Sequence, residues 1–190
     1  VFVLEEIGKD EEHNAVIKER RNGQGAEVAG VTVEGKVAYL SLVQLQAGVT
    51  WQKSHYTRPE KWSKDSSVPA EKRIFRTPDW YGYFTATYSP VKPLNIALSG
   101  TYTGSMIVQH MKGYIPKDIA VTTPDFFDMN LKISYDFSLY KFITLQLNAG
   151  IQNIFNAYQR DFDQGKERDS GYIYGPSMPR SYFAGAKLMF

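Results

Sequence analysis

Several stretches of the chain alternate apolar and polar residues with a period of two. The alternation is clearest over 142–152, where the odd positions are apolar: Ile143, Leu145, Leu147, Ala149 and Ile151. The even positions are small or polar: Thr144, Gln146, Asn148, Gly150 and Gln152. Because successive side chains of a strand point to opposite faces, this segment predicts a strand with one apolar and one polar face.

The same alternation recurs along the chain. It is present in six other segments: 26–36, 43–52, 80–89, 94–103, 127–137 and 181–190. Residues 1–7 predict one more strand, but their pattern does not show which side chains share a face. No segment predicts a helix. The pattern therefore predicts an all-β chain of about eight strands.

The predicted connections alternate between long and short. The long ones are 8–25, 55–78, 108–124 and 155–180, and they hold 28 of the 42 formal charges. The short ones are turns near 37–40, 90–93 and 138–141. Long connections thus lie at one end of the sheet and tight turns at the other, which is typical of outer-membrane β-barrels. A soluble β-sandwich also alternates, but it does not need every long connection at one end.

The charges within the predicted strands keep to one face. Charges inside strands occupy polar positions: Asp128, Lys132, Asp136 and Lys187. Charges at apolar positions occur only at strand ends: Glu27, Lys53 and Asp125. A lysine facing lipid at the bilayer midplane costs ~2–4 kcal/mol. The pattern therefore favours an antiparallel transmembrane β-barrel, in which Asp128 and Asp136 are placed to form salt bridges with Lys132 or with a segment inside the barrel.

Composition narrows the classes further. Aromatic residues make up 14% of the chain and gather near both ends of the predicted strands, as in the aromatic girdles of membrane barrels. The net charge of +2 gives no nucleic-acid footprint. Cysteine is absent, which excludes disulfides, thiol catalysis and Cys-ligated zinc. The chain starts with Val1 and has no signal-peptide pattern, so we expect a mature product or a fragment.

The end of the chain resembles the closing strand of outer-membrane barrels. Phe190 is the last residue, and apolar side chains precede it at every second position, among them Tyr182 and Leu188. In such barrels this terminal pattern is the signal that the barrel assembly machinery reads. We therefore expect Tyr182, Leu188 and Phe190 to form an assembly signal.

More of the chain is similar to TonB-dependent outer-membrane receptors. Residues 145–158, with Asn153-Ile154-Phe155-Asn156 near their end, resemble the penultimate strand of that family. Residues 171–190, with Pro179-Arg180 before the last strand, resemble its closing loop and strand, and 76–88 its loop-to-strand entry. Residues 28–34 depart from the family, since Thr32 stands where a glutamate is usual. Residues 100–110 look like members from Bacteroides-type bacteria.

The resemblance implies a fold and a function. The family has a 22-stranded barrel with an N-terminal plug, so residues 1–190 correspond to the C-terminal third of the barrel, with plug and TonB box absent. We expect a fragment, or a receptor whose remainder lies in another chain. The function implied is uptake of a scarce nutrient, such as a ferric siderophore, cobalamin, haem or a glycan. The partners implied are outer-membrane lipid, the rest of the receptor, the TonB complex and the barrel assembly machinery.

The candidate ligand contacts lie in the long connections. Aromatic and cationic side chains there suit anionic or aromatic ligands. The predicted ligand-binding residues are Trp62, Arg76, His110, Met111, Tyr114, Arg160 and Tyr174. Further loop candidates are His55, Arg58 and Tyr172.

Three other ligand hypotheses are weaker than their ordinary alternatives. His110-Met111 is a pair that suits haem iron, although a solvated loop pair is the favoured reading. The carboxylates of Asp10, Glu11 and Glu12, or of Asp161, Asp163, Glu167 and Asp169, are oxygen ligands that suit calcium, but they lack EF-hand spacing. Lys18, Arg20 and Arg21 are placed to pair with lipopolysaccharide phosphates or simply to be solvated.

No catalytic constellation emerges, so we predict neither an enzyme nor a resident cofactor or metal. Gly23-Gln24-Gly25 is a turn signal rather than a nucleotide-binding fingerprint. The main alternative function is a complete eight-stranded barrel acting as an anchor, adhesin or lipid-binding protein.

Overall fold

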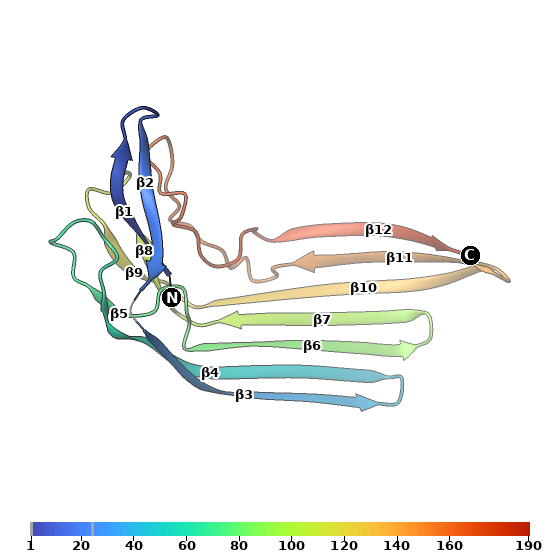
Figure 1. The fold of residues 1–190 in the computed structure, drawn as a ribbon. Helices are drawn as coiled ribbons and strands as arrows, with labels where there is room; N and C mark the ends of the chain where they lie inside the picture. Colours follow the sequence, from blue (N-terminus) through green and yellow to red (C-terminus); the bar gives the residue numbers. More distant parts are fainter. Residues whose placement is uncertain (1, 24) are drawn as a thin grey trace.

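The fold, taken from a computed structural model that describes residues 2–23 and 25–190, consists of strands and their connections (Figure 1). The strands are β1 (Phe2–Asp10), β2 (Ala15–Asn22), β3 (Ala26–Tyr39), β4 (Val43–Glu60), β5 (Glu71–Arg73), β6 (Trp80–Val91), β7 (Leu94–Thr103), β8 (Ile107–His110), β9 (Ile119–Thr122), β10 (Phe126–Tyr140), β11 (Ile143–Gln152) and β12 (Ser181–Met189). Among these described residues no helix is long and apolar enough to cross a membrane.

Seven long strands form one antiparallel meander. Their order is β12–β11–β10–β7–β6–β4–β3, and the short β5 pairs with the far end of β4. Tight turns join the strands at one end, where the C-terminus also lies, and the longer connections gather at the other end (Figure 1). The predicted all-β class and the placement of the long connections are therefore confirmed.

The register of the meander places the apolar positions on one face. Ile133 of β10 lies opposite Ile96 of β7 and Ala149 of β11. Directly opposite residues of an antiparallel pair share a face, so the alternation seen in each segment extends across the sheet. On β3, the side chains of Val33 and Val37 are 63% and 66% exposed. No second sheet packs on this apolar face within the described residues, which argues against a β-sandwich.

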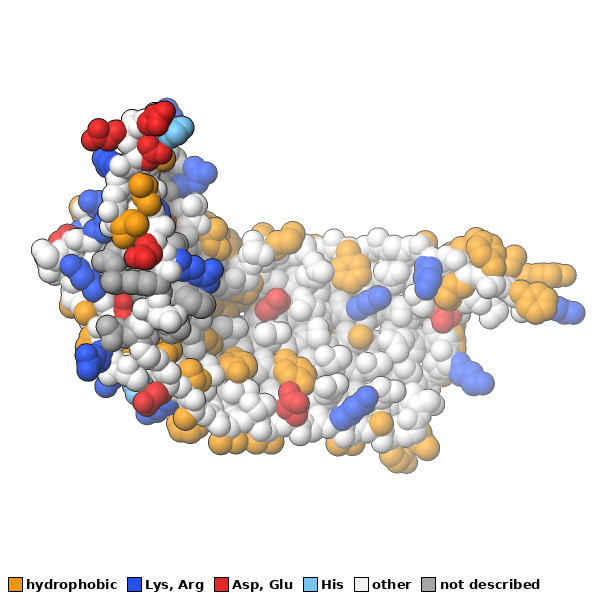
Figure 2. Space-filling view, in the orientation of Figure 1, with side chains coloured by type: hydrophobic (Ala, Val, Ile, Leu, Met, Phe, Trp, Pro, Cys, Tyr) orange, Lys and Arg blue, Asp and Glu red, His pale blue; other side chains and the backbone are white. Residues whose placement is uncertain are grey.

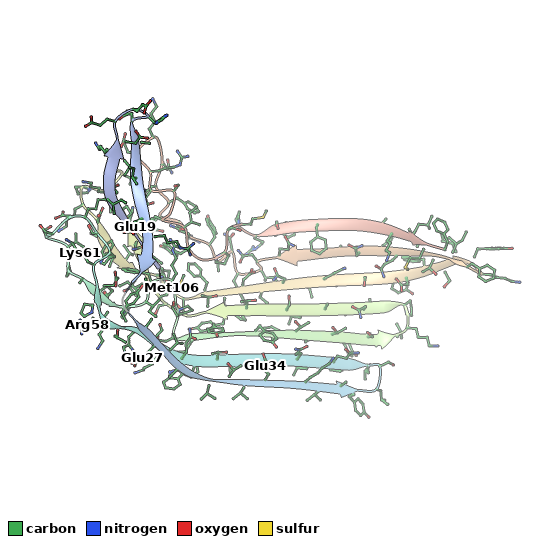
Figure 3. The ribbon with its side chains drawn as sticks, viewed as in Figure 1. Glu19, Glu27, Glu34, Arg58, Lys61 and Met106 are labelled. Carbon is green, nitrogen blue, oxygen red and sulfur yellow. The ribbon has the colours of Figure 1, made fainter. Side chains whose placement is uncertain are left out.

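Neutral polar side chains dominate the other face. The hydroxyls of Thr32 and Thr50 lie 2.9 Å apart across β3 and β4. The hydroxyl of Tyr83 donates to Glu34, two residues beyond Thr32, at 3.2 Å. Figure 2 shows a few charged side chains on a largely neutral face, with hydrophobic side chains along its lower edge. The position of Glu34 is labelled in Figure 3.

The salt bridges expected for Lys132 on this polar face are not formed among the described residues. Asp136 instead accepts a hydrogen bond from the Gln146 amide at 2.7 Å. The second predicted partner, Asp128, has a buried Oδ1 atom without a hydrogen-bond partner in the described part of the chain. The strand register explains the difference, because it places Gln146 directly opposite Asp136.

Aromatic rings lie on glycines of neighbouring strands. A Cβ atom added to Gly100 of β7 would lie 2.3 Å from the ring of Phe84, and one added to Gly150 of β11 would lie 2.5 Å from the ring of Phe183. On the apolar face Phe84 also stacks near Phe127, with ring centroids 6.3 Å apart. These glycines therefore provide room for rings that cross from the adjacent strand.

The first predicted strand is present, but it is not part of the meander. β1 pairs with β2 in a separate two-stranded sheet, and β2 lies in the segment 8–25 that was predicted to be a loop. The turn between them is held by Asp10, which accepts hydrogen bonds from the backbone N–H groups of Glu12 and His13. The charges of β2 interrupt its alternation, which is why the sequence pattern missed this strand. The strand predicted at 1–7 is therefore not part of the main sheet, whose eighth strand is the short β5.

The meander is an open sheet. Its edges are β3 and β12, which lie at opposite ends of the strand order. A complete eight-stranded barrel would need these two strands to pair. The arrangement of the described residues therefore gives no support to the alternative of a small closed barrel.

Candidate functional site

The candidate site is the group of long connections at one end of the sheet. It comprises the segment 61–79 with β5, the β8–β9 hairpin and the strandless connection 153–180 (Figure 1). The β1–β2 hairpin stands beside them, and an ion pair of 2.6 Å joins Glu6 of β1 to Lys64. The sequence placed most of the candidate ligand contacts in these connections.

A small apolar cluster anchors the connections to one another. Its buried members come from four positions in the chain: Val108, Phe126, Tyr172 and Tyr174. Val108 is fully buried, and Tyr172 and Tyr174 are 3% and 7% exposed. The predicted ligand residue Tyr174 and the further candidate Tyr172 therefore belong to the core of this cluster rather than to its surface.

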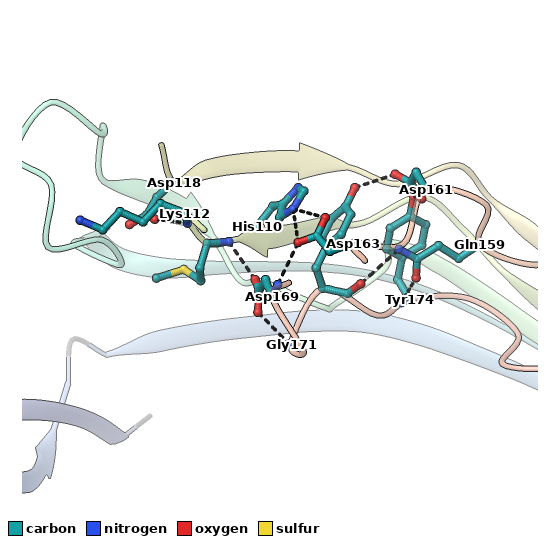
Figure 4. Close-up of polar contacts among 11 residues, drawn as sticks. His110, Lys112, Asp118, Gln159, Asp161, Asp163, Asp169, Gly171 and Tyr174 are labelled. Carbon is teal, nitrogen blue, oxygen red and sulfur yellow. Dashed lines mark hydrogen bonds and ion pairs between the residues drawn. The ribbon is translucent and has the colours of Figure 1, made fainter. Parts of the chain in front are cut away.

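His110 is held between an aromatic ring and a carboxylate. Its ring stacks on that of Tyr172, with centroids 3.7 Å apart and planes 6° apart. Its Nε2 atom lies 2.9 Å from both carboxylate oxygens of Asp163, whose side chain is 2% exposed (Figure 4). Because this nitrogen already has a partner and His110 is buried, the arrangement does not favour His110 as a haem ligand.

Two buried tyrosines share one carboxylate. The hydroxyls of Tyr172 and Tyr174 donate to the two oxygens of Asp161 at 2.8 and 2.6 Å. Burial raises the pKa of Asp161, but the hydrogen bonds from the two tyrosines outweigh it and leave that pKa below its ordinary value. Burial and the bond to Asp161 together raise the pKa of Tyr174 to about 12. The pair of tyrosines thus stays protonated and fixed to the connection 153–180.

Amide side chains take the place of strand pairing in this connection. Gln159, which is 1% exposed, donates to the carbonyl of Tyr172 and accepts from the backbone N–H of Tyr174. Asn153, with φ of +50°, donates to the carbonyls of Ala157 and Met178. Buried backbone groups need partners, so these two side chains fix the path of a long segment without strands.

Arg76 joins two connections. Its guanidinium donates to the carbonyl oxygens of Gly171 and Ile173, and its own backbone N–H donates to the carbonyl of Ile107 at 2.8 Å. Arg76 has φ of +59°, a conformation that costs a non-glycine residue energy and that these bonds hold in place. The predicted ligand residue Arg76 therefore fixes the loops to one another.

The carboxylates considered as calcium ligands accept hydrogen bonds from the protein. Asp169 accepts from the backbone N–H groups of Met111 and Gly171, and Asp163 from that of Asp169 (Figure 4). In the described part of the chain no group of three or more His, Asp or Glu residues is arranged to hold a metal ion. Asp118 is similar, because Ser63 and the N–H of Lys112 lower its pKa by hydrogen bonding.

Four of the predicted ligand residues remain accessible. Met111 and Tyr114 are 37% and 56% exposed. Arg160 is exposed above the ring of Tyr158, with 5.5 Å between its guanidinium carbon and the ring centroid. Trp62 is half-buried and donates to the carbonyl of Pro69. These side chains are the ones that a ligand can reach without opening the loops.

Trp62 lines a hollow of about 290 Å³ between the segment 61–71 and β9. Its other walls include Pro69, Ile119 and the cationic side chain of Lys117. The lining also holds the carboxylates of Glu71 and Asp118, so the hollow suits a flat, uncharged group rather than an anion. Sequence reasoning identified Trp62 but missed Lys117, which becomes a neighbour only through the β8–β9 pairing.

The predicted assembly signal lies where the strand pattern placed it. Tyr182 and Leu188 of β12 lie opposite Ile151 and Leu145 of β11, on the apolar face. Phe190 follows the strand and is 91% exposed. Of the cations considered for lipopolysaccharide, Lys18 and Arg20 lie on β2, and the side chain of Arg21 is outside the described part of the structure.

Two solved structures share the fold. One is the FpvAI–pyocin S2 complex, with a TM-score of 0.58 and 15% identity over 92% of this chain and 20% of that one. The other is the closed form of the ferric-catecholate import receptor Fiu from Escherichia coli K12, with a TM-score of 0.58 and 19% identity over 99% of this chain and 24% of that one.

The chain therefore spans a fifth to a quarter of the length of these structures, with 20% and 24% of each covered. No protein-family model and no curated protein matches the sequence. At these identities the likeness concerns the fold. The described residues have the antiparallel β fold seen in TonB-dependent receptors.

Proposed function

We propose that this chain forms part of the barrel wall and outer loops of a TonB-dependent receptor in the outer membrane of a Gram-negative bacterium. The receptor takes up a scarce nutrient: a ferric siderophore, cobalamin, haem or a glycan. The chain is the C-terminal third of a 22-stranded barrel, of the Bacteroides type, and its partners are the rest of the receptor, the TonB complex, the barrel assembly machinery and outer-membrane lipid. It carries no catalytic activity.

The apolar face of the meander is the observation that carries this proposal. It extends across seven strands, bears charge only at strand ends and is not covered within the described residues. A ten-residue strand such as β11 is about 33 Å long, and a tilt of about 40° reduces its height to about 25 Å. That height equals the apolar band of an outer-membrane barrel. The strands therefore have the length and the facing that a bilayer requires.

The open edges and the polar face are also consistent with a wide barrel. In lipid each backbone N–H and C=O needs a partner, so β3 and β12 require further strands. The polar face carries mainly small and neutral side chains, whereas the interior of an eight-stranded barrel is filled by its own side chains. A plug inside a large barrel gives this face a partner, and Asp128 has an unpaired Oδ1 there.

In this proposal the ligand contacts only those predicted residues whose side chains are accessible in the loops. Trp62, Met111, Tyr114 and Arg160 remain the candidate contacts, whereas Arg76, His110 and Tyr174 act on the ligand only through the loop structure. Fiu is described as a ferric-catecholate import receptor. The hollow at Trp62 offers an aromatic wall against which a catechol ring can stack, but its lining holds two carboxylates, Glu71 and Asp118, beside the one cation Lys117.

The membrane orientation is tested with spin labels on the full-length chain in lipid vesicles. The 190 residues contain no cysteine, so Leu147→Cys and Asn148→Cys each introduce one labelling site there on opposite faces of β11. We expect the label at Leu147 to relax with oxygen, which partitions into lipid, and to be shielded from a water-soluble nickel complex. A label at Leu147 that responds mainly to the nickel complex would refute the membrane proposal.

The uptake function is tested by deleting the gene and measuring growth with each nutrient class as the limiting source. We expect one class to fail, and loss of TonB to give the same defect. Normal growth on all four classes would refute nutrient uptake while leaving the barrel assignment intact.

A further inference from the structure

A second hollow lies beside β5, where the sheet meets the loops. It has a volume of about 280 Å³, and its walls include the cationic side chains of Lys53 and Arg73, together with His55. The ring of His55 is itself held at 3.4 Å from the carboxylate of Glu27. Glu27 and Arg58 mark this corner of the molecule in Figure 3. None of the candidate ligand residues of the sequence analysis apart from His55 borders this hollow.

The hollow results from a bulge in the pairing of β4. The N–H of Gln52 donates to the carbonyl of Asp79, and His55 pairs with Arg73. Two residues of β4 therefore face the five residues 74–78 of the other segment. The extra residues have no partner on β4, and the hollow beside them is lined by residues of β4 and β5 and of the neighbouring segments 74–79, 105–106 and 122.

The cations of this hollow have no partner of opposite charge within the described residues. The structure forms no ion pair with Lys53 or Arg73, whereas His55 is paired with Glu27. His55 and Arg73 lie opposite each other, and Lys53 is two residues further along β4, about 7 Å away. Two cations this close repel each other, and the positive potential that they create attracts an anion.

The remaining lining residues fit an oxyanion. The hydroxyls of Ser54, Ser105 and Thr122 are hydrogen-bond donors for oxygen atoms, whereas the hydroxyl of Thr77 donates to the carbonyl of Phe75. Asp79 is the one carboxylate of the lining, so the hollow keeps an excess of positive charge. Its volume lies below the ~300–1,000 Å³ typical of sites for drug-sized ligands, which favours a small group over a whole siderophore or haem.

We propose that this hollow binds a phosphate-type oxyanion, with Lys53 and Arg73 as its cationic contacts. An arginine binds two oxygens of such a group through its planar fork, and a lysine adds a point charge. The phosphate group comes either from a soluble anion or from a lipid headgroup. This site does not depend on which nutrient the receptor carries, nor on whether it carries one.

The test is calorimetric titration of the full-length chain in neutral detergent with inorganic pyrophosphate. We expect the double variant Lys53→Gln/Arg73→Gln to bind at least about tenfold more weakly, because both charge-assisted hydrogen bonds to the anion are lost. The matched control is Arg58→Gln/Lys61→Gln, which removes the same two residue types from the same end of the molecule (Figure 3). We expect that control to bind as the unaltered protein does.

The two double variants distinguish binding in this hollow from nonspecific attraction of the anion to positive charge. Equal weakening in both double variants, or no binding of pyrophosphate by the unaltered chain, would overturn the proposal. A change of gel mobility between heated and unheated samples confirms that each variant is folded. Competition by phosphorylated lipid A, but not by its dephosphorylated form, assigns the site to a lipid headgroup. Binding of pyrophosphate that neither lipid disturbs assigns it to a soluble anion.

Discussion

Replacing Asp163 by leucine should open the connection 153–180. Its carboxylate, 2% exposed, binds His110 Nε2 through both oxygens at 2.9 Å and accepts the N–H of Asp169. Removing this carboxylate leaves the buried His110 Nε2 and the N–H of Asp169 without their hydrogen-bond partner, and each such loss costs about 1–3 kcal/mol. His110→Phe should cost a similar amount, since it keeps the stacking on Tyr172 but leaves the carboxylate without its donor.

The double variant distinguishes pairing from simple loss of packing. In His110→Phe/Asp163→Leu both polar partners are gone, so we expect a cost of about 1–2 kcal/mol, mostly from the orphaned N–H of Asp169. That N–H is equally unpaired in Asp163→Leu alone, and the thermodynamic cycle cancels it. The coupling between the two positions should therefore be about 2 kcal/mol or more.

Hydrogen exchange of the full-length chain in detergent measures this effect. Local opening free energies are read from amide exchange in the peptides that cover 157–175. A loss of about 3 kcal/mol corresponds to exchange that is roughly 100-fold faster. Single variants that change exchange less than about fivefold, or a double variant equal to the sum of the singles, would show that this pair does not hold the loops together.

Three further predictions concern the wall, the loop chemistry and assembly. Gly100→Val should reduce the folded fraction in a heat-modifiability gel, because its side chain would meet the ring of Phe84, whereas Gly35→Ala should have little effect, since nothing lies within 4 Å of its added Cβ. The pKa of Tyr174 is raised to about 12, so its contribution to loop stability is complete below about pH 10 and is lost as the pH rises through about 12; a tyrosinate absorbance titration of Tyr174→Phe should lack this late-titrating group. Deleting Phe190 should lower the amount of assembled protein in outer-membrane fractions by several-fold without producing a soluble folded form, and unchanged amounts would exclude its role as an assembly signal.

The wall of the molecule was largely predictable from the sequence. The period-two pattern needs only the geometry of a single strand, and in segments such as 142–152 it fixes which side chains share a face. The predicted tight turns also account for three of the strand pairings, β3 with β4, β6 with β7 and β10 with β11. The β1–β2 hairpin was missed because its charges, such as Lys18 and Arg20, break the alternation that reveals a half-buried strand.

The site was less predictable, because its contacts join distant parts of the chain. His110 and Asp163 are 53 residues apart, and Arg76 reaches Gly171 from 95 residues away. Neither contact can be detected from the local pattern of apolar and polar residues. The residue types were a partial guide: loop histidines, arginines and tyrosines were expected to bind something. The partners that the structure gives them are groups of the protein itself.

The use of these side chains as partners for the protein itself follows from the length of the connection 153–180. A segment that long without strands has many backbone N–H and C=O groups with no ladder to join, and the buried ones need partners. Gln159, Asn153 and Arg76 supply those partners, and the carboxylate of Asp163 serves both a side chain and the main chain. A ligand that used these same groups would have to open the loop and bear the cost of their lost bonds. Binding in the closed loop is therefore restricted to side chains that the fold does not use, such as Arg160, and a ligand that depends on His110 must be one that binds an opened form.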